Sequence, residues 1–143
     1  MYNNFSNSDF NTLIKFLKRK PILTQNRNVK IFEKKWSKWL GVKYSLFVNS
    51  GSSANFLTLA TLSEISKKTK RNQIIVPTLT WVSDMVSVIK NNFEPVFVDI
   101  NLNNLSMNIE NVLKKINKKT LAIFITHAQG FNGLNEKLLN KIK

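Results

Sequence analysis

A short turn of small, polar residues is the part of this sequence best suited to hold a ligand. Asn49-Ser50-Gly51-Ser52-Ser53 joins an apolar run to a helical pattern at residues 53–68. The first turn of a helix offers unpaired N–H groups and a partial positive charge, Gly51 permits close approach, and the serines add hydroxyl groups. The pattern indicates a phosphate cradle. An ordinary turn with a serine N-cap is the alternative, and the stretch is neither a Walker A loop nor a GxGxxG motif.

A tryptophan follows the next apolar run at the matching place. Trp81 falls in the first turn of an expected helix at 81–92, which follows an expected strand at 72–76 and a turn that begins at Pro77. Ligands of open α/β sheets bind at the carboxyl ends of the strands, so Trp81 would face the same edge as the turn. A large aromatic side chain beside a phosphate cradle suggests that a flat ring stacks on it. Packing of Trp81 in the core is the alternative.

Two later strand ends carry polar side chains for which a structural role is favoured. Asp99 lies near the end of the run 94–100, where we expect it to hold a turn, and His127 and Gln129 lie in the stretch 125–133. A single histidine is more often a hydrogen-bonded structural residue than a catalyst. The chain has no cysteine, which excludes a disulfide framework, a thiolate nucleophile and a cysteine-ligated metal.

The elements that position these residues alternate along the chain. Residues 8–19 and 28–40 read as helices, with Ser8 as the cap of the first and a stripe of Phe32, Trp36 and Trp39 expected in a core. Strands are then expected at 43–48, 72–76, 94–100 and 121–126, and helices at 53–68, 81–92, 107–118 and 135–143. This order predicts an α/β fold with a mainly parallel sheet and flanking helices.

The chain is strongly basic, with a net charge of +14 over 143 residues. The lysines are spread throughout, so we interpret most of them as a solvated surface. A basic nucleic-acid-binding module is an alternative that rests on charge alone, without a recognisable motif. No apolar run is long enough to span a bilayer, and the N-terminus lacks a signal-peptide pattern, so we expect a soluble, cytoplasmic protein without a membrane partner.

In this order, the stretches from about residue 20 to 143 resemble the DegT/DnrJ/EryC1/StrS family of pyridoxal-phosphate-dependent sugar aminotransferases. The resemblance rests on Val-Asn-Ser-Gly-Ser-Ser-Ala at 48–54, Val-Pro-Thr-Leu-Thr-Trp at 76–81 and Pro-Val-Phe-Val-Asp at 95–99. It implies part of the large domain of a fold-type I, aspartate aminotransferase-like enzyme. Residues 1–143 would be its N-terminal portion, with N-terminal helices at 1–40 and the start of the α/β core at 41–143.

The resemblance assigns the site residues. Ser52 and Ser53, with the backbone after Gly51, would hold the phosphate of pyridoxal or pyridoxamine phosphate, and Trp81 would stack on the pyridine ring. The family's aspartate that pairs with the pyridine nitrogen, its Schiff-base lysine and its C-terminal small domain would lie beyond Lys143. We therefore name no catalytic residue and expect this chain alone not to transaminate.

The resemblance also implies a substrate class. The full-length enzyme would use a nucleotide-linked keto-sugar and an amino donor such as glutamate, in polysaccharide or glycan biosynthesis, as a homodimer. The stretch Thr-His-Ala-Gln-Gly-Phe-Asn-Gly at 126–133 resembles a branch of 3-dehydrases in which histidine replaces the lysine and pyridoxamine phosphate is used. The residues present do not decide between aminotransferase and dehydrase. A non-catalytic remnant is the remaining alternative.

Overall fold

The computed structural model describes residues 4–134 and 136–142, and these fall into two compact units. One unit comprises the chain up to Phe47 and the other the chain from Val48 onwards. Each has its own local packing and is described by itself. The turn at 49–53, Trp81 and the sheet all belong to the second unit.

The first helix of the first unit, α1 (Asn7–Lys18), begins with a capping box. The Asp9 N–H donates to Ser6 Oγ at 3.2 Å, and the Ser6 N–H donates to Asp9 Oδ2 at 2.8 Å. The Ser6 hydroxyl also donates to Asp9 Oδ2 at 2.7 Å, and this bond, followed by that from the Ser6 N–H, holds the pKa of the Asp9 carboxyl below its ordinary value. The predicted cap, Ser8, is wrong: the box needs an acidic side chain three residues after the cap, and only Ser6 has Asp9 at that spacing.

The second helix, α2 (Arg27–Leu40), confirms the prediction for 28–40 and ends at Gly41 in a left-handed conformation with φ 75°. The rings of Trp36 and Trp39 lie 4.9 Å apart between centroids, and Phe32 stacks on Trp36 at 5.8 Å. The expected burial of this stripe is wrong, since the Trp39 side chain is 75% exposed. The described residues of this unit supply too little chain to cover the stripe.

The predicted strand at 43–48 is absent. A strand needs a neighbour to pair its backbone groups, and no ladder is recorded for these residues in the described part of the chain. The Phe47 N–H donates instead to a carboxylate oxygen of Glu33 at 2.9 Å, and Tyr44 is 79% exposed. The apolar run was sufficient to suggest a strand, but strand formation depends on a partner that the run itself does not specify.

The second unit contains a parallel sheet in the order β2-β1-β3. Its strands are β1 (Gln73–Pro77), β2 (Glu94–Val98) and β3 (Thr120–Ile123), which confirm the runs expected at 72–76, 94–100 and 121–126. Ile75 pairs with Val96 on one side and with Ile123 on the other, so β1 is the central strand.

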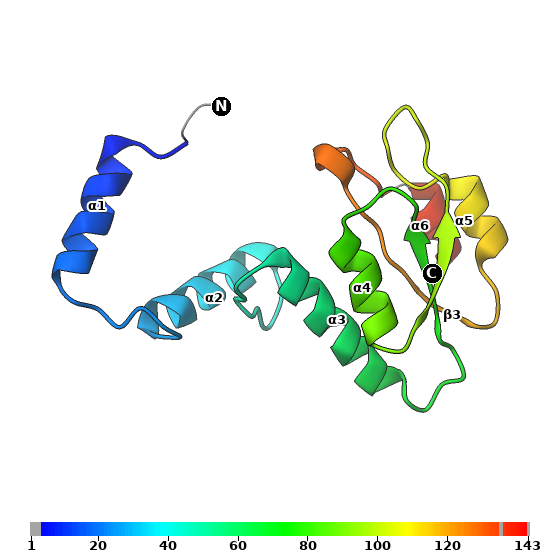
Figure 1. The fold of residues 1–143 in the computed structure, drawn as a ribbon, viewed down its shortest axis with the longest axis horizontal. Helices are drawn as coiled ribbons and strands as arrows, with labels where there is room; N and C mark the ends of the chain where they lie inside the picture. Colours follow the sequence, from blue (N-terminus) through cyan, green and yellow to red (C-terminus); the bar gives the residue numbers. More distant parts are fainter. Residues whose placement is uncertain (1–3, 135, 143) are drawn as a thin grey trace. The chain divides into compact units, whose positions relative to one another are not determined.

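Helices cover both faces of this sheet (Figure 1). Ile74 and Val76 pack with buried residues of two helices on one face, while Ile75 points to the opposite face, because side chains alternate along a strand. The first face is covered by α3 (Gly51–Ser66) and α4 (Val82–Lys90), and the second by α5 (Ile109–Lys115) and α6 (Glu136–Ile142). The predicted α/β fold with a parallel sheet and flanking helices is confirmed.

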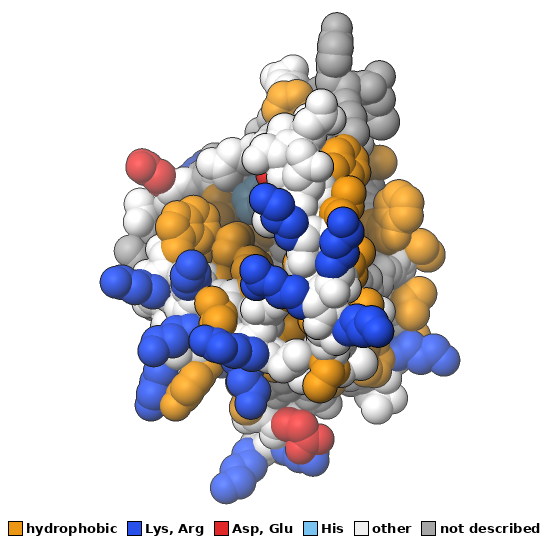
Figure 2. All heavy atoms as spheres, turned by 90° about the vertical axis from the view of Figure 1, so that its left-hand side faces the viewer, with side chains coloured by type: hydrophobic (Ala, Val, Ile, Leu, Met, Phe, Trp, Pro, Cys, Tyr) orange, Lys and Arg blue, Asp and Glu red, His pale blue; other side chains and the backbone are white. Residues whose placement is uncertain are grey.

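The surface carries the basic excess in a dispersed form. Figure 2 shows Lys and Arg side chains (blue) scattered among hydrophobic ones (orange) over the face seen there. Among the helices of residues 4–134 and 136–142, none is both long and apolar enough to cross a membrane.

An ion pair between Lys137 and Glu110 joins α6 to α5 on the second face of the sheet. The ammonium group, through its hydrogen bond and charge, lowers the pKa of the Glu110 carboxyl. A carboxylate whose pKa is lowered by folding stabilises the fold at neutral pH, and this contribution is lost as the pH falls through the folded-state pKa.

The ion pair can be tested by removing its cation. We expect Lys137→Met to raise the pKa of Glu110 towards its ordinary value, as followed by NMR titration of the carboxyl carbon. Lys141→Met, on the same helix, is the matched control, and equal titration curves in all three proteins would contradict the assignment.

Candidate functional site

The turn at 49–53 forms the N-terminus of α3, which begins at Gly51, two residues before the predicted start. Ser50 is the N-cap: its Oγ accepts the Ser53 N–H at 3.1 Å and donates to Ser53 Oγ, also at 3.1 Å. The Ala54 N–H donates to the Ser50 carbonyl at 3.1 Å and begins the helical ladder. The N–H groups of Gly51 and Ser52 therefore precede the first intrahelical bond and point to the space before the helix.

The space beside this turn is open. A Cβ placed on Gly51 would meet no atom within 4 Å, and Ser52 is exposed. Gly51 is not in the left-handed region, so its backbone does not require glycine. Its contribution is room rather than conformational freedom. The turn thus combines two unpaired N–H groups, two hydroxyl groups and an accessible approach, which suits a phosphate-sized anion.

Trp81 occupies the N-cap position of α4, four residues beyond the end of β1. Its side chain is 72% exposed, so the alternative of core packing does not hold within this unit. An exposed indole at a helix start provides a flat apolar surface on which an aromatic ring can stack. The structure places Trp81 and the turn of α3 in the same unit, but records no direct bond between them.

A polar cluster that sequence reasoning missed lies between these two elements. The Asp84 side chain, only 5% exposed, accepts a hydrogen bond from Asn55 Nδ2 at 2.7 Å and another from Thr80 Oγ1. Thr80 Oγ1 lies 2.7 Å from Thr126 Oγ1, which follows β3. The cluster therefore links α3, the start of α4 and the carboxyl ends of β1 and β3. The only local signal was the spacing of Thr80 and Asp84, four residues apart at a helix start.

Asp99 and His127 hold turns, as predicted. Asp99 Oδ1 accepts the Ile100 N–H at 2.8 Å, and the Asp99 carbonyl accepts the Asn108 N–H at 2.8 Å. His127 Nδ1 accepts the Gly133 N–H at 2.9 Å. In both cases the polar atom is engaged with nearby backbone, which suits a structural role.

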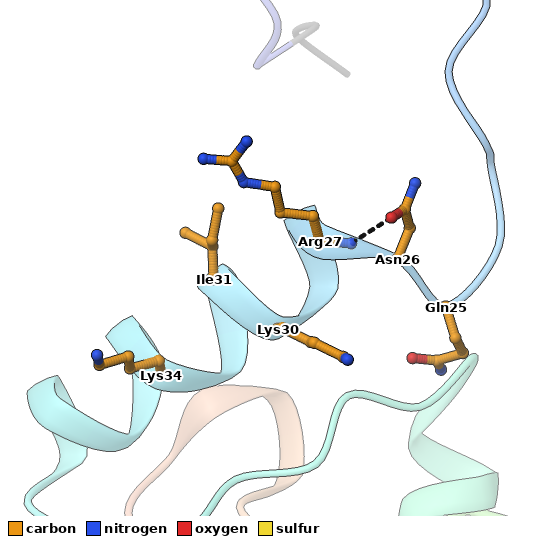
Figure 3. A pocket seen from close by; sticks show the side chains of 6 residues that line it. All are labelled: Gln25, Asn26, Arg27, Lys30, Ile31 and Lys34. Atoms are coloured by element: carbon orange, nitrogen blue, oxygen red, sulfur yellow. Dashed lines mark hydrogen bonds between the residues drawn. The ribbon is translucent and has the colours of Figure 1, made fainter.

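A basic hollow of about 490 Å³ in the first unit is a weaker candidate. In Figure 3 the side chains of Arg27 and Lys30 point to different sides of α2, so their charges do not converge on one position. The Asn26 side chain is engaged as the N-cap of α2, where it accepts the Arg27 N–H at 2.6 Å. The lining residues are Gln25, Asn26, Arg27, Lys30, Ile31 and Lys34. Three of these residues are cations, but Arg27 and Lys30 point to different sides of α2, so the hollow is a weaker anion site than the turn of α3.

Comparisons with known proteins agree on one family. The model of the DegT/DnrJ/EryC1/StrS aminotransferase family matches residues 4–137. A GDP-4-keto-6-deoxy-D-mannose 3-dehydratase of Escherichia coli O55:H7 is 33% identical over 123 residues, which are 85% of this chain and 31% of that protein. The chain therefore spans about a third of the length of such relatives.

Solved structures give the same result. A GDP-4-keto-6-deoxymannose-3-dehydratase with a trapped PLP-glutamate geminal diamine superposes with a TM-score of 0.85 at 30% identity, covering 99% of this chain and 36% of that one. A Helicobacter pylori aminotransferase involved in the biosynthesis of pseudoaminic acid superposes with a TM-score of 0.79 at 27% identity, covering 96% of this chain and 36% of that one. The α/β architecture is thus part of the fold of fold-type I sugar aminotransferases and dehydratases.

The cap at Ser50 can be tested by its effect on stability. We expect Ser50→Ala to lower the free energy of unfolding by about 1 kcal/mol, because the N–H of Ser53 loses its acceptor. Ser52→Ala, two residues further along and exposed, is the matched control and should stay within about 0.5 kcal/mol of the parent. Urea unfolding followed by circular dichroism measures both. Equal losses in the two variants would show that Ser50 has no special role.

Proposed function

Because this chain belongs to the DegT/DnrJ/EryC1/StrS aminotransferase family, we propose that its second unit binds the phosphate and ring of pyridoxal 5'-phosphate or pyridoxamine 5'-phosphate. The phosphate lies at Gly51, Ser52 and Ser53, and the pyridine ring stacks on Trp81. The single observation that carries the proposal is the helix start at Gly51, which presents unpaired N–H groups and hydroxyls to open space. Solved relatives bound to this cofactor support it.

The directions of the hydrogen bonds in the turn leave the Ser53 hydroxyl free to act as a donor. Ser50 uses its hydroxyl proton on Ser53 Oγ, while the Ser53 N–H donates back to Ser50 Oγ. The hydroxyl proton of Ser53 is then available for a phosphate oxygen, together with the N–H groups of Gly51 and Ser52. The positive end of the α3 dipole adds to the attraction for a dianionic phosphate.

The bound cofactor would supply the electron sink for chemistry at the carbon that bears the amino or keto group. The residues of this chain bind and orient it: the turn fixes one end through the phosphate, and Trp81 fixes the plane of the ring. Stacking also removes apolar ring surface from water on both partners. None of the residues proposed here transfers a proton.

For the complete protein we propose the substrate class of its relatives, a nucleotide-linked keto-sugar, with glutamate as amino donor and a homodimeric assembly. The activity would be aminotransfer in glycan biosynthesis. Dehydration at the sugar C3 is the second candidate, favoured by the 3-dehydratase relative and by the 3-dehydratase structure with PLP-glutamate. The two candidates place the same demands on Ser52, Ser53 and Trp81, since both use the phosphate and the ring.

Pyridoxamine 5'-phosphate is the appropriate binding probe, because the aldehyde of pyridoxal phosphate would also react with the many lysine amines. We expect the chain to bind this probe and to shift its phosphorus NMR signal. Ser52→Asp should weaken binding at least about tenfold, since a carboxylate then faces the phosphate. Thr61→Asp adds the same charge on an exposed position in the middle of α3 and is the matched control. Absence of binding to the parent chain would overturn the proposal.

The stacking role of Trp81 has its own test. We expect Trp81→Ala to lower the affinity for pyridoxamine 5'-phosphate about two- to tenfold, the range of an aromatic pair, whereas Trp81→Phe retains most of it. Trp39→Ala removes a tryptophan of similar exposure from α2 and serves as the matched control. Isothermal titration calorimetry gives the affinities of the parent and of the three variants. Equal affinity of Trp81→Ala and the parent would exclude stacking on this residue.

A further inference from the structure

Asp84 is the one buried acidic residue among the described residues of the second unit, and the proposed function does not yet use it. It lies in the first turn of α4 and is 5% exposed. Its Oδ1 accepts from Asn55 Nδ2 at 2.7 Å, and its Oδ2 accepts from Thr80 Oγ1, while Thr126 Oγ1 lies 3.4 Å from the same oxygen. The partners recorded for this carboxylate among the described residues are all neutral.

The protons of this cluster can be assigned. Thr80 and Thr126 have one hydroxyl proton each, and their oxygens lie 2.7 Å apart. If Thr80 donates to Asp84, Thr126 is left to donate to Thr80, which gives a chain of donors that ends on the carboxylate. Asn55 donates from the other side. The Asp84 side chain is therefore the common acceptor for Asn55 on one side and for the pair of threonines on the other.

The hydrogen bonds of this cluster hold the backbone on both sides of Trp81. Thr80 precedes Trp81 and Asp84 follows it by three residues, and both are bound within the cluster. The Asp84 N–H also donates to the Trp81 carbonyl at 3.0 Å. The backbone that carries the exposed indole is therefore fixed on both sides by partly buried hydrogen bonds.

The same carboxylate reaches the element that carries the phosphate turn. Asn55 lies two residues after Ser53 on α3, and its amide is bound to Asp84 at 2.7 Å. The start of α3 and the start of α4 are thereby joined through one side chain. Burying a carboxylate among neutral groups is a costly way to join two helices, and what it provides is directional hydrogen bonding, which apolar packing does not supply.

We propose that Asp84 is a positioning residue, which sets the Trp81 ring at a fixed place relative to the phosphate turn at Gly51–Ser53. The proposal rests on the proposed function for its consequence: a ligand with both a phosphate and an aromatic ring binds more tightly than phosphate alone only while Asp84 holds the two elements. Asp84 itself does not touch the ligand.

The first test needs no ligand. In a background with Trp36→Phe and Trp39→Phe, Trp81 is the remaining tryptophan of the three in the chain. We expect Asp84→Ala to increase the mobility of the Trp81 ring, measured by time-resolved fluorescence anisotropy. Asp84→Asn should restore most of the order, because its oxygen can accept from Asn55 while its amide donates to Thr80. Asp99→Ala, at an exposed aspartate after β2, is the matched control. Unchanged anisotropy in Asp84→Ala would overturn the proposal.

The second test compares two ligands, inorganic phosphate and pyridoxamine 5'-phosphate. We expect Asp84→Ala to lower the affinity for pyridoxamine 5'-phosphate about two- to tenfold and to leave that for inorganic phosphate within about twofold. In the Trp81→Ala background the same change should have no further effect, because Asp84 acts through Trp81. An equal loss for both ligands, or additive losses in the double variant, would overturn the proposal in favour of a general loss of structure.

Folding and function remain separable in this design. If circular dichroism shows that Asp84→Ala is unfolded, Thr80→Val replaces it, since this variant keeps the side-chain shape and removes the donor. It should raise the mobility of the Trp81 ring and lower affinity for pyridoxamine 5'-phosphate in the same way, and a null result would again overturn the proposal. If the parent chain binds neither ligand while the anisotropy responds to Asp84, the proposed function fails and the positional coupling stands.

Discussion

The central strand β1 is the constraint on which the rest of the second unit depends. Ile74, Ile75 and Val76 are all fully buried, with neighbouring strands at both edges and helices over both faces. A parallel strand in this position leaves no polar group free along its length. Polar chemistry is therefore confined to the places where the strands end and the helices begin. Thr80, Trp81 and Thr126 all lie at such places, and α3 joins them through Asn55.

Local patterns were sufficient for most of the fold. The apolar runs at 72–76, 94–100 and 121–126 became β1, β2 and β3 because each found a parallel neighbour. The equally apolar run at 43–48 did not form a strand, since pairing is a property of two segments. Exposure of Trp39 has a similar origin: a helical stripe predicts a face to be covered, but the covering surface comes from elsewhere in the chain.

The residues of the candidate site also differ in whether their sequence context was sufficient to identify them. Gly51, Ser52, Ser53 and Trp81 were identified from sequence because their meaning is local: each stands at the start of a helix after an apolar run. Their role in binding remains a prediction. Asp84 was not identified, because its partners Asn55 and Thr126 are 29 and 42 residues away along the chain. The sequence around a single aspartate in a helical pattern does not show whether its side chain is solvated or is a buried hydrogen-bond acceptor.

The glycine at the start of α3 shows what the proposed function asks of the sequence. Gly51 has no left-handed backbone and no crowded neighbour, so an alanine would fit there without strain. Alanine is also the better helix former, by up to about 1 kcal/mol in a helix interior, and it restricts the unfolded chain. On thermodynamic grounds alone, glycine is the poorer choice. Under the proposed function, the methyl group of an alanine at position 51 would occupy the approach to the first N–H groups of α3. At this position, thermal stability and ligand affinity therefore favour different residues.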